Sequence, residues 1–475
     1  MSHDCSFLRD VLPDDQVAFT DATRAAHADD WGTEGTSKAN QPDAVVYPES
    51  TEDVAAVLAA ADERGIPVTP YAAGTSMEGN PVPRFGGVSL DLTRMDAVLE
   101  VRLDDFQIDV QPGVLGSAVD EAVADHGMFF PPLPSSGSIS TVGGMIANDA
   151  SGMQTVKYGE VGDWVLELEA VTAAGETFTA GSTAKKTSAG YNLADLLVGS
   201  EGTLAVVTRA TLELAGRPDQ IRGGRAVFPS LGDAADAVFD AVRSGVDVAK
   251  IELLDETAGM MANDYFGLGL PDSAMIFVEF HADHHVEEEI AFCRSVFEAH
   301  DVSSFEIAAD DEMDELWAAR EELAFAVGDY DPDLTPLHPG DITVPISKLP
   351  EIIRYAKQLA AEHELLIPCF GHAGDGNVHY TVLADESDEA MVERGEQVYA
   401  AIVERAIELG GTATGEHGVG MGKRDYLEAE HGAVAVDVMR RVKGALDPND
   451  TLNPGKLFPE TDEGDGRVLL EGVGD

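Results

Sequence analysis

Two glycine-rich stretches near the C-terminus hold the residues best suited to chemistry. Both lie within residues 371–422, where Gly-His-Ala-Gly-Asp-Gly-Asn-Val-His is followed by Gly-Glu-His-Gly-Val-Gly-Met-Gly. The imidazoles of His372 and His379 and the carboxylate of Glu416 have the composition of an open catalytic zinc site. The imidazole of His417, beside this carboxylate, is free to accept a proton. We therefore expect a metal centre with a neighbouring base.

The spacing of the two histidines leaves an alternative open. His372 and His379 do not share a helix face, so both can point inward only if the chain reverses between them. Residues 374–377, Gly-Asp-Gly-Asn, are turn formers that would supply this reversal. A glycine-rich turn with two incidental histidines explains the first stretch equally well. Adding Glu416 and His417 from the second stretch favours the metal site.

The acidic composition excludes several classes of partner. The 475-residue chain carries 87 Asp and Glu against 30 Lys and Arg, a formal net charge of −57. Such a surface repels nucleic acid and anionic lipid. Because molar salt shortens charge repulsion to about 3 Å, this composition suits a salt-rich cytosol, and we expect a halophilic protein. With 44% hydrophobic residues, the chain can form two or three globular domains.

Cysteine usage and the absence of long apolar runs point to the cytoplasm. Cys5, Cys293 and Cys369 lie far apart and form no Cys-x-x-Cys pair, which excludes an iron–sulfur or cysteine–zinc framework. We expect no disulfides. The N-terminus lacks a basic and then apolar signal sequence, and no apolar run approaches the ~20 residues that span a bilayer. The protein is expected to be soluble, and at most peripheral to the cytoplasmic face of a membrane.

The elements upstream of the two stretches alternate between strand and helix. Residues 1–39 are predicted to form a leader, with a short helix over residues 14–28. Residues 44–48 are typical of a strand that ends at a proline. Ser50 is then placed to cap an amphipathic helix, and residues 66–70 begin the next strand. This pattern is typical of a mixed α+β domain.

Two loops in this region have the composition of ligand-binding segments. Residues 71–79, Tyr-Ala-Ala-Gly-Thr-Ser-Met-Glu-Gly, follow a strand and would expose backbone N–H groups to a phosphate. They match neither a P-loop nor Gly-x-Gly-x-x-Gly, and taken alone a plain surface turn explains them equally well. Residues 129–152 form a long run rich in Pro, Ser and Gly, which inside a globular domain is typical of a binding loop.

The chain changes character after residue 217, and two features stand out there. Arg320, close to Trp317, suits a substrate carboxylate because its guanidinium offers a bidentate fork, although pairing with a nearby acid is equally consistent. The other feature is the cluster of His281, His284 and His285. A metal is conceivable, but surface histidines on a strand-to-helix turn are favoured.

The N-terminal segments resemble the flavin domain of the vanillyl-alcohol-oxidase-type, FAD-linked oxidases. The resemblance is carried by the loop at residues 73–76, by the stretch from Gly143-Gly144 to Ser151-Gly152, and by Gly-Ser-Glu-Gly-Thr at residues 199–203. It implies two α+β subdomains that bind FAD. We see no covalent attachment residue in the loop at 72–79, so noncovalent FAD is expected. The implied FAD contacts come from the loops and from the later Asn-Pro-Gly-Lys motif: Ala73, Gly74, Thr75, Ser76, Pro134, Ser135, Thr141, Gly144, Asn148, Ser151, Gly152, Glu201, Gly202, Val207 and Asn453.

The C-terminal half resembles the cap domain of FAD-linked D-lactate dehydrogenases and glycolate oxidase flavin subunits. Besides the two glycine-rich stretches, Asp-Ile-Thr-Val-Pro-Ile-Ser and Leu-Asn-Pro-Gly-Lys carry this resemblance. It implies that His372, His379 and Glu416 bind a divalent metal, for which zinc is expected. It further implies that His417 is the base and that Arg320 holds the substrate carboxylate.

One departure concerns the related D-2-hydroxyglutarate dehydrogenases. In those enzymes, Thr and Lys residues after the arginine grip the distal carboxylate. Here Ala324 stands at the expected Thr position, and no Lys lies between Arg320 and Asp341. The departure favours a short monocarboxylate, although His338 could partly substitute for the missing groups.

These observations together predict an α+β protein. We expect a leader over 1–39, a two-subdomain FAD-binding domain over 40–217, an α+β substrate and metal domain over 218–458, and an acidic flexible tail over 459–475. The expected reaction is the FAD-dependent oxidation of a small D-2-hydroxy acid, D-lactate first, with metal-assisted proton abstraction and hydride transfer to flavin. Electrons would leave to an external acceptor such as a cytochrome or quinone, not NAD.

Three alternatives remain open at this point. The chain could be the flavin subunit of a multi-chain glycolate oxidase, or a D-2-hydroxyglutarate dehydrogenase. It could also be a flavoprotein scaffold whose metal is structural, in which case four protein ligands would close the coordination. The sequence does not fix the oligomeric state.

Overall fold

The computed structural model describes residues 2–308, 310–460 and 468. The described chain divides into two compact units. One comprises residues 1–151, 160–217 and 416–475, and the other comprises residues 152–159 and 218–415. Most of the expected acidic tail lies outside the described residues. In the described part, no helix is long and apolar enough to cross a membrane.

The first unit begins with a four-stranded sheet built around a parallel core. Its order is β1-β2-β4-β3, and β2 and β3 each pair with β4 in parallel. Helix α3 (Thr51–Asp62) connects β2 to β3, as the sequence predicts. It starts where the Ser50 hydroxyl accepts the N–H of Asp53 at 3.1 Å, and it buries the apolar face set by residues 54, 57, 58 and 61. The strands are β1 (Val17–Ala18), β2 (Ala44–Val46), β3 (Val68–Tyr71) and β4 (Val88–Asp91).

The N-terminal residues contribute to this unit's core. Leu8, in helix α1 (Leu8–Val11), is fully buried in the cluster that includes the apolar face of α3. The helix expected over residues 14–28 is wrong in extent. Residues 17–18 pair with β2 as strand β1, and only α2 (Asp21–Ala25) is helical after them. A strand forms here in place of the expected helix because Val17 and Ala18 pair with β2 at the edge of the sheet.

A five-stranded antiparallel sheet forms the rest of the first unit's framework. Its order is β5-β6-β10-β8-β9, and its core is closed by three short helices and by β7, which pairs with β11. The elements are β5 (Val98–Arg102), β6 (Gln107–Val110), β7 (Met128–Phe129), β8 (Val165–Val171), β9 (Thr177–Gly181), β10 (Val206–Glu213), β11 (Ala215–Gly216), α4 (Gly116–Ala124), α5 (Val142–Asn148) and α7 (Leu193–Leu197).

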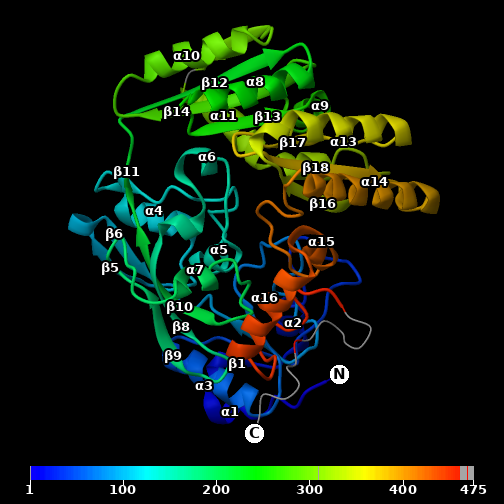
Figure 1. The fold of residues 1–475 in the computed structure, drawn as a ribbon. Coiled ribbons are helices and arrows are strands. Elements are labelled where there is room, and N and C mark those ends of the chain that lie inside the picture. Colours follow the sequence, from blue (N-terminus) through cyan, green and yellow to red (C-terminus); the bar gives the residue numbers. More distant parts are fainter. Residues whose placement is uncertain (1, 309, 461–467, 469–475) are drawn as a thin grey trace. The chain divides into compact units, whose positions relative to one another are not determined.

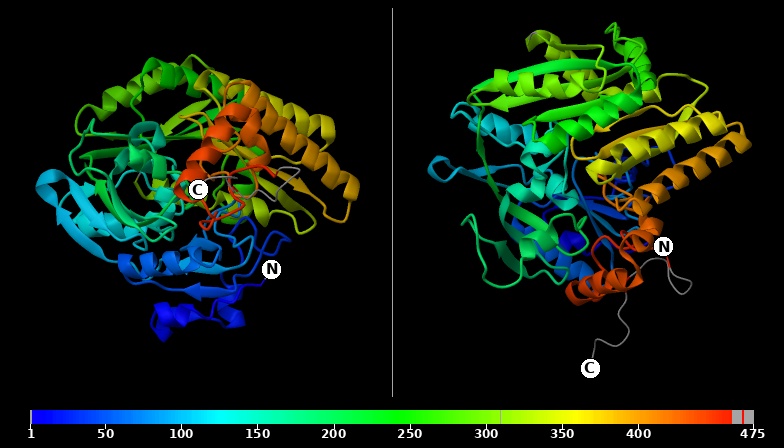
Figure 2. Two further views of the ribbon diagram at one scale, coloured as in Figure 1. Left: turned by 60° about the horizontal axis from the view of Figure 1, so that its bottom comes forward. Right: turned by 45° about the horizontal axis from the view of Figure 1, so that its top comes forward.

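The C-terminal segment returns to the first sheet. Helices α15 (Leu427–His431) and α16 (Ala433–Leu446), drawn in orange to red in Figure 2, are followed by a chain segment that lies beside β3. Leu452 forms a parallel bridge with Val68, and the Asn453 N–H donates to the Val68 carbonyl at 2.8 Å. The first and the last stretches of the described chain, residues 2–151 and 416–460, therefore belong to one unit.

The second unit is organised on a seven-stranded sheet with the order β15-β12-β14-β13-β17-β18-β16. Every pairing in it is antiparallel. Figure 1 shows α13 and α14 lying side by side along it. The strands are β12 (Gln220–Phe228), β13 (Lys250–Leu254), β14 (Ala274–Ala282), β15 (Ser304–Ile307), β16 (Thr335–Thr343), β17 (Cys369–His372) and β18 (Asn377–Ala384).

Helices cover both faces of this sheet. Helices α8, α10, α13 and α14 pack on one face, and α9, α11 and α12 pack on the other, where Trp317 and Phe370 belong to one apolar cluster. This second face also carries Glu252 and His372, because the two are opposite one another in the β13–β17 register. The helices are α8 (Leu231–Ser244), α9 (Glu256–Phe266), α10 (Val286–Glu298), α11 (Asp310–Glu321), α12 (Leu323–Gly328), α13 (Leu349–His363) and α14 (Glu389–Glu408).

A buried ion cluster fixes the last helix of the first unit. The Lys443 ammonium forms an ion pair with Asp447, lies 3.3 Å from an Asp450 oxygen, and donates to the Leu452 carbonyl at 2.8 Å. Asp447 also accepts the N–H groups of Thr451 and Leu452. Because all these charges are sealed from water, removing the cation would leave two carboxylates uncompensated.

Replacing Lys443 by Met is expected to lower the free energy of unfolding by ~3–5 kcal/mol, the usual cost of breaking a buried ion pair from one side. Chemical denaturation measures this change. Arg441→Met on the same helix is the control. Arg441 pairs with Asp437 at 2.6 Å on the surface, so its loss should cost no more than ~1 kcal/mol. Equal costs for the two variants would contradict the assignment.

Candidate active site

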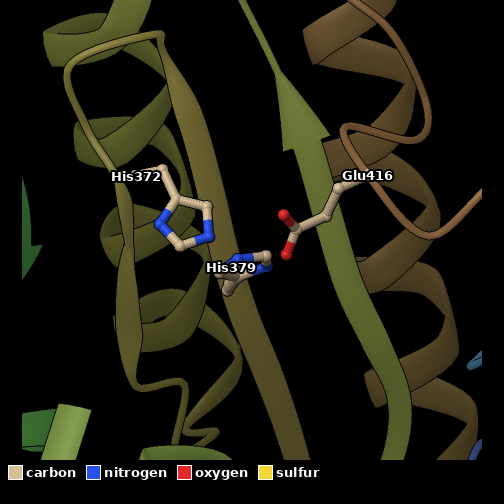
Figure 3. A group of neighbouring side chains, drawn as sticks. All are labelled: His372, His379 and Glu416. Carbon is tan, nitrogen blue, oxygen red and sulfur yellow. The ribbon is translucent and has the colours of Figure 1, made fainter. Parts of the chain in front are cut away.

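The three residues expected to hold a metal come together. One ligand atom each from His372, His379 and Glu416 lies within 4.8 Å of the others. Figure 3 shows the two imidazoles and the carboxylate pointing toward a common point. Two imidazoles and a carboxylate at this separation fit a divalent cation with an open coordination position. Among the described residues, no other group of three His, Cys, Asp or Glu side chains meets the same criterion.

A tight hairpin brings the two histidines together. His372 ends β17 and His379 lies in β18, and the strands pair with Phe370 opposite His379. The turn between them needs glycine at residue 376, where φ is +87° and a Cβ would lie 2.1 Å from the Val344 carbonyl oxygen. The reversal predicted from Gly-Asp-Gly-Asn is therefore confirmed.

A buried carboxylate orients the first of these histidines. Glu252 is fully buried on β13, and its Oε1 lies 2.8 Å from His372 Nδ1. Its Oε2 forms an ion pair with Arg320 Nη2 at 2.5 Å. Burial alone would raise the pKa of Glu252, yet Arg320 and His372 outweigh it and hold this pKa at about 2.

Arg320 keeps donors available inside the protein. Its side chain is 4% exposed, and neither Nε nor Nη2 has a hydrogen-bond partner. The guanidinium lies over the ring of Phe370, 5.0 Å from the centroid. Buried N–H groups without acceptors are costly, so this side chain is suited to an anion that arrives with a ligand. The alternative from the sequence, pairing with an acid, is present as well, through Glu252.

A second buried acid supports the other histidine. Asp341 Oδ1 lies 3.8 Å from His379 Nδ1, and Asp341 is fully buried. It accepts the Asn377 amide at 2.7 Å and the Gly415 N–H at 2.9 Å. The carboxylate thus joins the hairpin that carries His379 to the residue that immediately precedes Glu416.

The loop that follows Glu416 is hydrogen-bonded to other segments of the first unit. The Asn148 amide donates to the Glu416 carbonyl at 2.8 Å. The Glu201 carboxylate accepts the N–H groups of Val419 at 2.7 Å and Gly420 at 2.9 Å. Gly418 lies between these contacts with φ +76°, packed against Asn148 and Glu201. His417 is half-buried in this loop, and its Nε2 lies 3.9 Å from Glu416 Oε1.

The environment of Glu201 extends this polar cluster. Burial raises the pKa of Glu201, although the N–H groups of Val419 and Gly420 oppose the rise. The Asn80 amide donates to its carboxylate at 2.6 Å, and the Asn453 amide donates to its carbonyl at 2.8 Å. Lys456 then donates to the Asn453 side chain at 3.0 Å. Burial lowers the pKa of Lys456 to about 7.

The loops expected to hold a cofactor meet within the first unit. The hydroxyls of Thr75 and Ser140 are 3.0 Å apart, so the loop after β3 lies against the Pro- and Ser-rich segment. Ala73, Ser135 and Gly144 are exposed, and Gly74 has φ +66°. Small exposed residues on two adjoining loops fit a ligand that lies close against the backbone, as a dinucleotide does.

Several other residues expected to contact the cofactor already have protein partners. Ser76 donates to Asp30 at 2.8 Å, Thr141 caps α5, and Ser151 lies 3.5 Å from a Glu416 oxygen. The Gly152 N–H donates to Thr155 at 2.9 Å. Pro134 and Val207 are half-buried, whereas Gly202 is buried. The assignment of these residues to the cofactor stays a prediction.

Two domain families account for nearly the whole chain. The FAD-binding domain model matches residues 42–181, and the C-terminal domain of FAD-linked oxidases matches residues 217–457. The chain belongs to the FAD-linked oxidase family. The family that matches residues 42–181 is an FAD-binding domain, so FAD is the cofactor of this part of the chain.

Relatives with assigned names cover the chain almost end to end. A probable mitochondrial D-lactate dehydrogenase of Danio rerio is 36% identical over 96% of this chain and 92% of its own length. The glycolate oxidase subunit GlcD of Bacillus subtilis is 37% identical over 88% of this chain and 89% of its own length. The resemblance predicted from the glycine-rich stretches is confirmed.

Solved structures confirm the fold class. The 4-ethylphenol oxidase of Gulosibacter chungangensis covers 99% of this chain and 97% of its own, with a TM-score of 0.79 at 19% identity. p-Cresol methylhydroxylase has a TM-score of 0.77 at 15% identity, over 95% of both chains. The α+β, vanillyl-alcohol-oxidase-type architecture is therefore the one expected.

The structure also shows residues that the sequence did not single out. Glu252 and Asp341 each place a buried carboxylate beside a site residue, whereas Glu201, which the sequence assigned to the cofactor, binds the loop after Glu416. A Glu between the apolar residues Ile251 and Leu253 of strand β13 was the available signal for Glu252. The expectation of surface histidines is wrong for His281, which is buried and bonded to Glu279 at 2.8 Å and to the Tyr158 hydroxyl at 2.9 Å.

Gly418→Ala is expected to disturb the loop that carries Glu416 and His417. A Cβ there would lie 2.6 Å from Asn148 Oδ1 and 2.9 Å from Glu201 Oε1, in addition to the strain of a positive φ. We expect a loss of ~2–4 kcal/mol in the free energy of unfolding.

Gly432→Ala is the matched control, because Gly432 has φ +79° but nothing within 4 Å of its Cβ position. It isolates the backbone strain, expected to cost ~1 kcal/mol. Chemical denaturation compares the two variants. If Gly418→Ala cost no more than Gly432→Ala, the packing of this loop against Asn148 and Glu201 would be disproved.

Proposed function

We propose that the protein oxidises a small D-2-hydroxy acid, D-lactate first, to the 2-oxo acid with noncovalent FAD. The observation that carries the proposal is the convergence of two imidazoles and a carboxylate on one point. The buried Arg320 lies close by, because Glu252 contacts both this arginine and His372. The names of the relatives, D-lactate dehydrogenase and glycolate oxidase subunit, support the substrate class.

The side chains divide the chemistry among themselves. His372, His379 and Glu416 would hold a divalent cation, with zinc expected, which as a Lewis acid favours loss of the α-hydroxyl proton. Arg320 offers N–H groups to the substrate carboxylate and so determines which hydrogen on Cα faces the oxidant. His417 accepts the hydroxyl proton. Bound FAD would supply the acceptor for the hydride that leaves Cα.

The surroundings of Arg320 favour a short substrate. Ala324, at the position expected for a distal-carboxylate ligand, is exposed on α12. His338 is held by Glu396, whose two carboxylate oxygens both lie 3.0 Å from its Nε2. An acid already paired with His338 opposes a second substrate carboxylate there. D-Lactate is therefore preferred over 2-hydroxyglutarate.

Glycolate is the second candidate substrate. The similarity to the Bacillus subtilis GlcD subunit is as high as that to the lactate enzymes. Under this alternative the chain would act within a multi-chain complex. In both cases electrons pass to an external acceptor, a cytochrome or quinone, since the three cysteines of the chain are free and buried. We propose the cytoplasm, with peripheral contact to its membrane, as the location.

Anaerobic mixing of the FAD-loaded protein with small D- and L-2-hydroxy acids tests this function. We expect D-lactate to bleach the visible flavin absorbance, glycolate to do so more slowly, and D-2-hydroxyglutarate and L-lactate to have little effect. Treatment with a chelator should slow the bleaching, and added zinc should restore it. His417→Ala should retain FAD but reduce at least ~100-fold more slowly, because a positioned base contributes about 10²–10⁴-fold.

Two results would count against the proposal. Bleaching by none of the hydroxy acids, with FAD bound, would reject the activity itself. Bleaching by D-lactate at an unchanged rate in His417→Ala would reject the base while leaving the activity in place.

We also propose that the protein is adapted to high salt. Its formal net charge is −57, so the folded state is destabilised by self-repulsion at low ionic strength. The free energy of unfolding should rise between 0.15 M and ~1 M potassium chloride, as the screening length falls from ~8 Å to ~3 Å. Thermal unfolding at a series of salt concentrations measures this.

Sucrose is the control for that measurement, since it favours burial by exclusion but does not screen charge. Stabilisation by potassium chloride well beyond that by sucrose is expected. A melting temperature that is independent of potassium chloride would contradict the adaptation.

A further inference from the structure

Glu252 lies on one face of the second unit's sheet, where it contacts both an expected metal ligand and the arginine expected to bind the substrate carboxylate. Cross-strand pairing places it directly opposite His372, so their side chains leave the sheet on the same side. Helix α11 covers this face and places Arg320 beside Glu252. One fully buried carboxylate therefore contacts both residues.

The contact with His372 decides which ring nitrogen is available. Glu252 Oε1 accepts a hydrogen bond from Nδ1 at 2.8 Å, so the proton of the neutral ring is held on that nitrogen. Nε2 then carries the lone pair, and the ring plane is fixed by the strand-to-strand contact. A carboxylate in this position also raises the basicity of the ligand nitrogen.

The contact with Arg320 sets where the guanidinium can lie. Oε2 is 2.5 Å from Nη2, and the Phe370 ring supports the guanidinium 5.0 Å from its centroid. Nη2 is thus ion-paired with Glu252, while the buried Nε has no hydrogen-bond partner among the described residues. Glu252 thus provides charge and position for Arg320 without saturating its donors.

Neighbouring charges on the same face do not share this role. Lys250, two residues earlier on β13, is 3.1 Å from Glu279, which also binds His281 at 2.8 Å. Glu279 is a buried acid one strand away, and its ion-pair partners among the described residues are Lys250 and His281. The sheet face therefore carries two separate acid-centred clusters.

We propose that Glu252 is the positioning residue that couples the metal ligand His372 to the carboxylate-binding Arg320. This inference rests on the proposed function. It assigns the alignment of both His372 and Arg320 to the side chain of Glu252. Its loss should weaken metal binding and substrate binding together, because each partner is oriented by a different oxygen of the same carboxylate.

Glu252→Gln in the FAD-loaded protein tests this role. The neutral isostere keeps the volume but offers only one acceptor oxygen. We expect the dissociation constant for zinc, measured by competition with a chromophoric chelator, to rise ~10–100-fold. The KM for D-lactate should rise as well, by at least ~10-fold, the scale of a lost charge-assisted contact. FAD content should be unchanged.

Glu279→Gln is the matched control, since it removes another buried charge from the same face. It should leave the zinc dissociation constant and the KM within about twofold of the unsubstituted protein. Glu252→Asp is the second variant, in case Glu252→Gln does not fold. Its shorter side chain keeps the charge but cannot reach both partners, so at least one of the two constants must rise.

The outcomes separate this inference from the function on which it rests. An unsubstituted protein that binds zinc and oxidises D-lactate, together with Glu252 variants that do both equally well, would overturn the coupling alone. A rise in only the zinc constant for Glu252→Gln would likewise overturn it, since Arg320 would then be independent. An unsubstituted protein without either property would overturn the proposed function first.

Discussion

Buried carboxylates that satisfy several donors at once hold the chemical part of this protein in place. Glu252, Asp341 and Glu201 each lie out of water and each contact two or more separate segments of the chain. A charge in that environment is tolerated only when it is paired or hydrogen-bonded. Each carboxylate therefore constrains its partners, since moving any of them away would leave the charge uncompensated.

This constraint explains how glycine-rich segments can hold the candidate site residues. The stretch around residue 418 has few side chains to pack, and glycine loses more conformational freedom on folding than other residues. Glu201 replaces that missing packing with two hydrogen bonds to backbone N–H groups, and Asn148 adds a third to the Glu416 carbonyl. These hydrogen bonds hold the glycine-rich segment in one conformation. Gly418 is required there because neighbouring polar atoms occupy the space that a Cβ would fill.

The sequence predicts the local features well and the distant ones poorly. Residue types and turn formers are enough for His372, His379 and Glu416, and the capping serine with periodic apolar residues is enough for α3. The partners of these residues are far away in the chain. His372 and Glu252 are separated by 120 positions, and Val419 and Glu201 by 218. No periodicity links residues at such distances, because only the folded sheets bring them together.

The errors have the same origin. The helix expected over residues 14–28 gave way to a strand because β2 offers a partner that the local sequence does not show. His281 was placed on the surface by its polar neighbours, yet strand β14 directs it inward to Glu279. Local composition describes the average environment of a segment, whereas strand pairing determines the face on which each side chain lies.

The acidic residues therefore serve two distinct purposes in one chain. Those on the surface produce the net charge of −57, and their repulsion decays over a length that salt controls. Those in the interior act through contacts of 2.5 to 2.9 Å with Arg320, His372, Val419 and Gly420, and the carboxylates that make these contacts are buried. Because buried pairs are screened much less than exposed ones, changes in salt act on the stability of the folded state while the alignment of the site is preserved. A highly acidic protein can in this way use carboxylates as its most precise internal anchors.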